Sequence, residues 1–331
     1  MPIAPELIER FTRGLDRRVP RDVPIGIAVS GGPDSIALLL LAARARPGAV
    51  EAATVDHRLR EGSADEARFV AEVCERLGVR HSILEADWGE TPQTAVQERA
   101  RVERYRLLRG WATERGLGAL ATAHHADDQA ETFLMRLARG AGIRGLAAMR
   151  PLAPTPGAQD GDAQLVRPLL GWRRSELEDV CAAEGIQPVT DPSNDDDRFE
   201  RVRVRRALAD LAWLDAAAIA QSAAHLASAH AALRWAVSQA WDQRVTAGAG
   251  EVQFDPSGLP DEILRRLARR AVLRLASEGQ GTDLRGRELD QLLSSLKSGG
   301  RSTLRGVLCS GGQNWRFIPA PNRTRRTGNS R

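Results

Sequence analysis

Short apolar stretches alternate with longer helical patterns in the first half of the chain, and this alternation restricts the fold more than any other feature. The stretches are rich in Val, Ile, Leu and Ala, and each is followed by ten or more residues of helical character. Such an alternation is typical of parallel strands joined by crossover helices. The sequence therefore predicts an α/β fold with a doubly wound parallel sheet. The expected strands are residues 25–30, 50–57, 80–87 and 117–125, and the expected helices are residues 34–46, 63–79, 94–116 and 127–140.

Polar residues stand at the carboxyl ends of three of these expected strands. Residues 30–35 follow the first strand, Asp56 and His57 end the second, and residues 124–128 follow the fourth. Ligands of open α/β sheets bind at the carboxyl edge of the strands. We therefore expect these three groups to form one site.

The remainder of the chain predicts further parts. Residues 151–163 are rich in proline and glycine and are expected to form a surface loop. Residues 302–320 predict a hairpin with its turn at Ser-Gly-Gly. The expected parts are an α/β domain (residues 1–210), a helical linker (211–247), a small α+β domain (248–320) and a disordered basic tail (321–331).

The basic residues are unevenly distributed along the chain. The 331 residues include 47 basic and 43 acidic side chains, and four of the arginines lie in the last eleven residues, which hold no acid. The rest of the chain is therefore neutral overall. A basic surface on the folded body must come from clustering of arginines, which suit bidentate phosphate contacts.

Cysteine usage and hydropathy exclude several classes of protein. Cys74, Cys181 and Cys309 lie far apart and form no Cys-x-x-Cys pair, which argues against a zinc knuckle or a disulfide framework. The N-terminus has no apolar core of a signal peptide. No apolar run approaches the roughly 20 residues that a membrane span needs. We expect a cytoplasmic protein without a membrane partner.

The loop Ser30-Gly31-Gly32-Pro33-Asp34-Ser35 is the first candidate for chemistry. Glycines after a strand allow a tight turn, and amide groups at the start of a helix can hold phosphate. Neither the Walker A pattern nor Gly-x-Gly-x-x-Gly is present. Asp34 would stand beside phosphate, which is reasonable if Mg²⁺ lies between them. A plain strand-to-helix turn with a capping residue is the alternative.

Several motifs together resemble one enzyme family. The stretch "AVSGGPDS" looks like the pyrophosphate-binding loop of the PP-loop ATP pyrophosphatases. The stretches "VDHRLR", "HHADDQAETFLMRLARGAGIRGLAAM" and "DPSNDDDRFERVRVR", with Ala100, Arg101, Arg104, Tyr105 and Leu108, resemble the tRNA(Ile)-lysidine synthase family in its own motif order. The later segments look like the short form of that family, with one C-terminal domain. The resemblance therefore implies a catalytic role for residues 1–210 and tRNA binding by residues 248–320.

The resemblance implies a reaction in two steps. ATP adenylates the C2 carbonyl oxygen of the wobble cytidine in an isoleucine tRNA with the anticodon CAU, and pyrophosphate leaves. Free L-lysine then attacks C2 and AMP leaves. The implied cofactors are ATP and Mg²⁺, and the implied partners are this tRNA and L-lysine. A homodimer stays open at this point.

The resemblance also assigns roles to single residues. It implies that Asp128 and Glu131 position the lysine amine, with Asp128 as the favoured base, and that His124 lies at the nucleotide. The candidate catalytic residues are Asp34, His124, Asp128 and Glu131. The candidate nucleotide-binding residues are Ser30, Gly31, Gly32, Pro33, Asp34, Ser35, Asp56 and His57, with Asp34 also as the metal ligand. The candidate tRNA-binding residues are Arg101, Arg104, Arg139, Arg144, Arg198, Arg201, Arg203 and Arg205.

Plainer interpretations accompany these assignments. The His-His-Ala-Asp-Asp block could bind zinc or only cap a helix, and Asp56 could only cap a strand end. The glycines of residues 139–145 fit a helix C-cap. In the arginine-rich segment, a strand would place Arg201, Arg203 and Arg205 on one face, and a helix would place Arg198, Arg201 and Arg205 on one face. Either face could bind phosphate, or it could simply be solvated. The family pattern has asparagine where this chain has Val202, so a role that needs that amide is in doubt.

Three other functions stay open from the sequence. A PP-loop thiolase such as a 2-thiocytidine synthetase would need cysteine pairs, often for an iron–sulfur cluster. A glutamine-dependent amidotransferase would need a glutaminase half. A nucleotide-binding protein without catalysis would not need the acidic block after the fourth strand.

Overall fold

The computed structural model describes residues 2–59, 62–89, 94–189, 198–211, 213–276, 284 and 286–321. Contacts divide the chain into two compact units, residues 1–227 and residues 228–331, and each is described by itself. The predicted disordered tail lies outside the described residues beyond Pro321, as do residues 190–197 of the aspartate-rich motif. No helix within the described ranges is long and apolar enough to cross a membrane.

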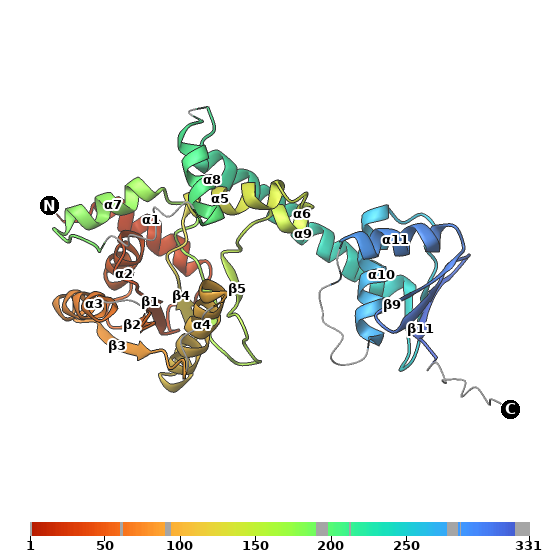
Figure 1. Ribbon diagram of the computed structural model, residues 1–331, viewed down its shortest axis with the longest axis horizontal. Helices are drawn as coiled ribbons and strands as arrows, with labels where there is room; N and C mark the ends of the chain where they lie inside the picture. The colour runs from red at the N-terminus through yellow and green to blue at the C-terminus, as the bar shows by residue number, and fades with distance from the viewer. Residues whose placement is uncertain are drawn as a thin grey trace. The chain divides into compact units, whose positions relative to one another are not determined.

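The first unit is built on a six-stranded sheet in the order β3-β2-β1-β4-β6-β5 (Figure 1). All neighbouring strands run parallel except the edge strand β5, which is antiparallel to β6. The predicted doubly wound α/β fold is therefore confirmed. The strands are β1 (Ile25–Ala28), β2 (Val50–Asp56), β3 (Arg80–Glu85), β4 (Ala119–Ala121), β5 (Leu152–Pro154) and β6 (Gln164–Val166).

Helices cover this sheet and join its strands. Helix α2 follows β1 and is buried almost all round, since residues 36–41 have no measurable exposure. A helix that is apolar on every side belongs in a core. The helices of this unit are α1 (Pro5–Asp16), α2 (Pro33–Ala45), α3 (Ser63–Leu77), α4 (Val96–Glu114), α5 (Ala126–Leu137), α6 (Ile143–Leu146), α7 (Arg174–Ala183) and α8 (Glu200–Ala209), and α9 (Ala216–Arg244) begins in it.

The packing of α4 on the sheet depends on a glycine in β1. A Cβ added at Gly26 would lie 2.6 Å from the ring of Trp111, which no real contact allows. Trp111 is 4% exposed and packs with Leu117 and Leu120 in a core below α4. Glycine therefore lets α4 approach the sheet closely, with the start of the helix at the carboxyl edge of the strands.

One prediction about this unit was wrong. Residues 151–163 were expected to form a surface loop, but Leu152–Pro154 form the edge strand β5. Proline is tolerated there because an edge strand leaves one row of its amide groups unpaired. The rest of that stretch is a connection back to β6.

The second unit contains an antiparallel sheet with two helices against it. Its strand order is β7-β8-β11-β10-β9, and the predicted hairpin is confirmed by the pairing of β10 with β11. Phe254, Trp315 and Phe317 pack together in its core. The elements are β7 (Val245–Ala247), β8 (Val252–Phe254), α10 (Asp261–Leu275), α11 (Gly286–Lys297), β9 (Arg301–Leu304), β10 (Val307–Ser310) and β11 (Trp315–Pro319).

Candidate active site

The loop between β1 and α2 is held in shape by one hydroxyl group. Ser35 Oγ accepts a hydrogen bond from the backbone amide of Ser30 at 3.1 Å and donates one to the carbonyl of Gly32 at 2.9 Å. Gly31 has a φ of 88°, which glycine adopts without strain. Helix α2 begins at Pro33, a residue suited to the first helical position. The loop therefore places the N-terminus of α2 at the carboxyl edge of the sheet, where it suits phosphate.

His125 connects this loop with the acidic block after β4. Its Nε2 lies 3.4 Å from an oxygen of Asp34 and 3.5 Å from an oxygen of Asp128, and its Nδ1 lies 3.2 Å from Asp127. Burial lowers the pKa of His125, but these carboxylates outweigh burial and raise the pKa to about 10. His125 is therefore a buried imidazolium that joins the loop and the block in one site.

Asp127 and Asp128 each cap the N-terminal end of a helix, and both also face His125. Asp127 accepts a hydrogen bond from the backbone amide of Arg174 at 3.0 Å and so holds the start of α7 against α5. Its hydrogen bond with His125 lowers its pKa to about 2. Asp128 accepts a hydrogen bond from the backbone amide of His125 at 3.0 Å, which caps the start of α5. The helix-cap interpretation is thus true of Asp128, which also faces the site.

Asp128 is kept ionised by its neighbours. Burial raises the pKa of this carboxyl, but the charges of His125 and Arg201 and the backbone hydrogen bond outweigh burial and lower it. An ionised carboxylate at the edge of a site is suited to bind an ammonium group.

The pKa of His124 is shifted in the opposite direction from that of His125. Its Nδ1 lies 3.0 Å from the hydroxyl of Thr122. Burial lowers its pKa to about 4, against the attraction of Asp128 and with the help of nearby arginines. The sequence analysis selected His124 and missed His125, because two adjacent histidines give no local signal of which one faces the loop.

Glu131 is occupied by two arginines of α8, which packs against α5 (Figure 1). Its oxygens lie 2.7 Å from Arg201 Nε and 2.6 Å from Arg205 Nε. Glu131 is only 1% exposed. The carboxylate that the resemblance assigned to lysine is therefore already paired, and Arg201 extends from it towards Asp128, 3.7 Å away.

The arginine-rich segment after residue 197 is a helix, not a strand. Helical spacing places Arg201 and Arg205 on one face, against α5, as the helical alternative predicted, but Arg198 precedes the helix and is not part of that face. Val202, which replaces the asparagine of the family pattern, is 7% exposed and belongs to the apolar side of α8.

At the end of β2 a second group of predicted residues meets α4. Asp56 accepts a hydrogen bond from the amide of Arg58 at 2.9 Å, so it caps the strand end. Trp88 stacks on His57 with ring centroids 6.3 Å apart, and Arg104 Nε lies 3.4 Å from His57 Nε2. Burial, together with the charge of Arg104, lowers the pKa of His57 to about 4.

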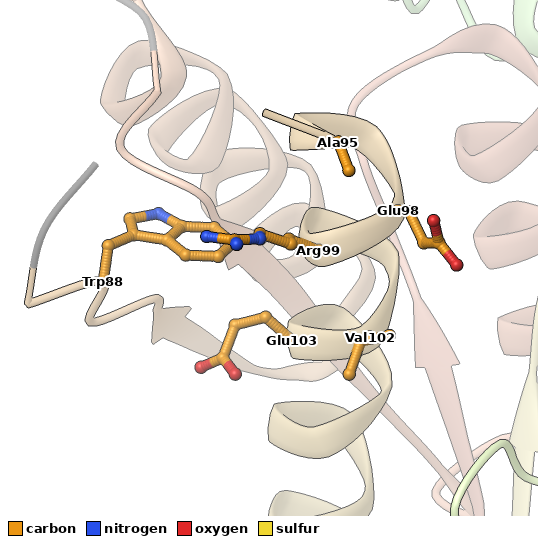
Figure 2. A pocket seen from close by; sticks show the side chains of 6 residues that line it. All are labelled: Trp88, Ala95, Glu98, Arg99, Val102 and Glu103. Carbon is orange, nitrogen blue, oxygen red and sulfur yellow. The ribbon is translucent and has the colours of Figure 1, made fainter. Parts of the chain in front are cut away.

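Two hollows flank this end of β2. One of about 580 Å³ is lined by Asp56, Arg58 and the start of α3. The other, of about 440 Å³, lies between Trp88 and the first turns of α4. Figure 2 shows Arg99 and Glu103 extending from α4 on the side of Trp88, while Glu98 points away. Both hollows lie beside the second predicted polar group, apart from the acidic block.

The remaining arginines proposed for tRNA contact lie at the surface. Arg139 forms an ion pair with Glu200, and Arg144 is exposed on α6. Arg198 and Arg203 are exposed around α8, where Arg203 donates to the carbonyl of Arg198. The glycines between Arg139 and Arg144 form the end of α5 and the turn into α6, as the C-cap interpretation expected.

The residues around Asp34 fit a divalent cation. Asp34 Oδ1 is buried and has no hydrogen-bond partner among the described residues, whereas Oδ2 faces His125. A buried carboxylate oxygen without a partner is costly unless something binds it. Carboxylate oxygen beside phosphate is the donor set that Mg²⁺ prefers.

The fold and this loop define a PP-loop ATP-binding domain, and the family profile of the PP-loop domain matches residues 6–212. The curated relatives narrow the class further. The chain is 48% identical over 296 residues to a tRNA(Ile)-lysidine synthase of Novosphingobium aromaticivorans, covering 89% of this chain and 88% of the relative. It is 44% identical to that of Zymomonas mobilis, with 90% and 89% covered. The chain belongs to the tRNA(Ile)-lysidine synthase family.

A solved structure gives an independent view of the fold. A U34-tRNA thiolase from Methanococcus maripaludis, with its [4Fe-4S] cluster, superposes with a TM-score of 0.54 over 66% of this chain and 78% of the thiolase. The identity is 17%, so the likeness shows the fold alone. In this chain burial raises the pKa of Cys74, Cys181 and Cys309 to about 12, which keeps these thiols protonated.

Proposed function

We propose that this chain joins L-lysine to C2 of the wobble cytidine in isoleucine tRNA with the anticodon CAU, at the expense of ATP. Family membership supports the reaction, and one observation carries its assignment to this site. His125 contacts Asp34 in the PP-loop and Asp128 in the acidic block. The group that would hold the triphosphate and the group that would hold the amine therefore share one edge of the sheet.

The first step activates an oxygen that is otherwise a poor leaving group. The C2 oxygen of cytidine attacks the α-phosphorus of ATP, the new O–P bond forms, and pyrophosphate leaves. Backbone amides of residues 30–35 and the start of α2 bind the pyrophosphate portion. Mg²⁺ held by Asp34 would supply positive charge to the phosphates. Asp56 and His57 are proposed for the nucleoside side of ATP, beside the hollow at the end of β2.

The second step replaces the activated oxygen by nitrogen. The ε-amine of lysine attacks C2, the C–O bond breaks and AMP leaves with its electrons. The free amine has a pKa of about 10.4 and arrives protonated. Asp128 binds this ammonium and accepts its proton as the amine attacks, while His125 fixes the carboxylate. Neutral His124 lies at the nucleotide, and Glu131 holds Arg201 and Arg205 over the site.

The tRNA is held by arginines around this edge. Arg101, Arg104, Arg139, Arg144, Arg198, Arg201, Arg203 and Arg205 are proposed to contact its phosphates, together with the C-terminal unit. Because tRNA, ATP and lysine meet in the cytoplasm, we place the reaction there.

The test uses the purified chain with labelled lysine and a transcript of the isoleucine tRNA. We expect lysine incorporation that needs ATP and Mg²⁺, with one pyrophosphate released for each lysine joined. A transcript with uridine at the wobble position is the matched control and should stay unlabelled. Mass spectrometry of the digested RNA identifies the modified nucleoside. Pyrophosphate release without lysine in the RNA would exclude the proposed ligase.

A further inference from the structure

Arg167 is a buried cation that the proposed chemistry does not use. It directly follows β6 and is 8% exposed. Its Nη1 donates to the carbonyl of Arg150 at 2.8 Å, while its buried Nε has no hydrogen-bond partner in the described part of the chain. No carboxylate within the described ranges forms an ion pair with it. A buried charge is stable only when it is paired or when a ligand pairs it.

The neighbours of Arg167 carry the same charge. Arg101 and Arg150 both act on Arg167 by repulsion, and burial together with this repulsion lowers its pKa. Tyr105 is a neutral side chain that contacts two of these arginines. Its hydroxyl forms a hydrogen bond with Arg167, and the guanidinium of Arg101 lies 5.1 Å from the centroid of its ring. The three arginines thus form a cluster whose charge the described residues do not balance.

The arginines of helix α4 differ between its two ends in whether they form ion pairs. Towards its end, Arg106, Arg109 and Arg115 each pair with a carboxylate. Towards its start, at the carboxyl edge of the sheet, Arg101 and Arg104 form no ion pair with any described residue. Unpaired arginines therefore gather where the strands end, which is where a substrate binds.

The strand order shows which substrate this cluster faces. The PP-loop follows β1, the acidic block follows β4, and Arg167 follows β6, the next strand outward. Thr122 donates its amide to Val166 at 3.0 Å, so Arg167 lies directly beside the segment that leads to His124. The cluster is thus beyond the acidic block as seen from the PP-loop, on the side of the acceptor and not of ATP.

We propose that Arg167, with Arg101 and Arg150, forms a phosphate site for the RNA backbone next to the nucleotide that is modified. The inference rests on the proposed function, since it takes RNA as the acceptor. A polyanion suits three unbalanced arginines, whereas the zwitterion of lysine would require a cation and an anion together. The carboxylate of lysine and the phosphates of ATP are the rival occupants.

Binding of a fluorescent anticodon stem-loop RNA with the sequence CAU tests the site, measured by anisotropy over a range of salt. Arg167→Gln should bind about tenfold more weakly. Its log–log salt slope should be shallower by about 0.7, the value of one phosphate contact on a single strand. Arg167→Lys keeps the charge and should recover most of the affinity. Arg115→Gln removes the same charge at the other end of α4 and should match the parent.

Separate readouts exclude a purely structural role and the rival occupants. Thermal unfolding shows whether Arg167→Gln folds. If it does not fold, the same RNA-binding measurement is made with Arg150→Gln, whose side chain is exposed, and the salt slope of its RNA affinity should also become shallower. Unchanged RNA affinity and slope in a folded variant overturn the proposal. So does a rise confined to the KM for lysine or for ATP. Lysine incorporation by the parent chain, measured in parallel, tests the proposed function independently.

Discussion

The pairing of Glu131 with α8 leads to a quantitative prediction for Glu131→Gln. The substitution keeps the shape of the side chain and removes its charge, so the hydrogen bond from Arg205 at 2.6 Å loses its charge assistance and the ion contact with Arg201 at 2.7 Å is lost. A hydrogen bond to a charged group is worth roughly 1.5–3 kcal/mol. The arginine side chains are 41% and 36% exposed, and water screens part of this energy. We expect a loss of about 2 kcal/mol, which lowers Tm by roughly 4–8 °C.

Urea unfolding of a double-mutant cycle measures the same interaction directly. The cycle compares Glu131→Gln, Arg205→Gln and the double variant, and the expected coupling free energy is about 1–2 kcal/mol. Lysine incorporation should fall in each single variant, because α8 no longer holds Arg201 beside Asp128. A coupling near zero with an unchanged Tm, but with a raised KM for lysine, would refute this reasoning. Glu131 would then contact the lysine amine itself, as the family resemblance implied.

Three further predictions concern single side chains. Asp34→Asn should abolish Mg²⁺-dependent pyrophosphate release while leaving the far-UV circular dichroism unchanged, and full release at the same Mg²⁺ concentration would exclude its metal role. Asp128→Asn keeps an oxygen for the cap of α5, so Tm should fall by only about 2–4 °C while lysine incorporation is lost; retained incorporation would contradict the role. Burial lowers the pKa of His57 to about 4 from 6.5, so this group stabilises the fold fully above pH 6.5 and loses its contribution as pH falls towards 4. The stability of His57→Gln should therefore fall less between pH 6.5 and 4, and an equal fall in parent and variant would show that His57 titrates normally.

Local patterns were sufficient to predict the elements with a long periodic signal. The strand β2 and the helices α2 and α5 lie within a few residues of their expected positions, because burial on both faces or capping chemistry leaves a local mark. The three-residue strands β5 and β6 leave none. Their pairing depends on an edge that only the folded sheet provides.

In the candidate site, too, features encoded by adjacent residues could be predicted, whereas features that depend on tertiary contacts could not. The loop around Asp34 was predictable, since a glycine turn before an apolar helix is encoded in adjacent residues. The partners of Glu131 were not, because α8 is about seventy residues away in the chain and its packing against α5 is a tertiary contact. Which of His124 and His125 faces the loop depends on where α5 begins, and the helix begins at Ala126, one residue earlier than expected. Arg167 is a single arginine after a very short strand and gives no pattern at all.

Acidic and basic side chains occupy different parts of the carboxyl edge of the sheet, and this separation suggests how the substrates are oriented in the site. Asp34 and Asp128 lie on either side of His125, after β1 and β4, so this part suits the two cations of the proposed reaction, Mg²⁺ and the lysine ammonium. Arginines that form no ion pair with a described carboxylate follow at β6 and at the start of α4, and this part attracts anions. An RNA strand that approached the acids directly would be repelled by them. If the proposed arginine site holds its phosphate, only the neutral base needs to enter between the acids, where its oxygen would meet the nucleotide and its C2 would meet the amine.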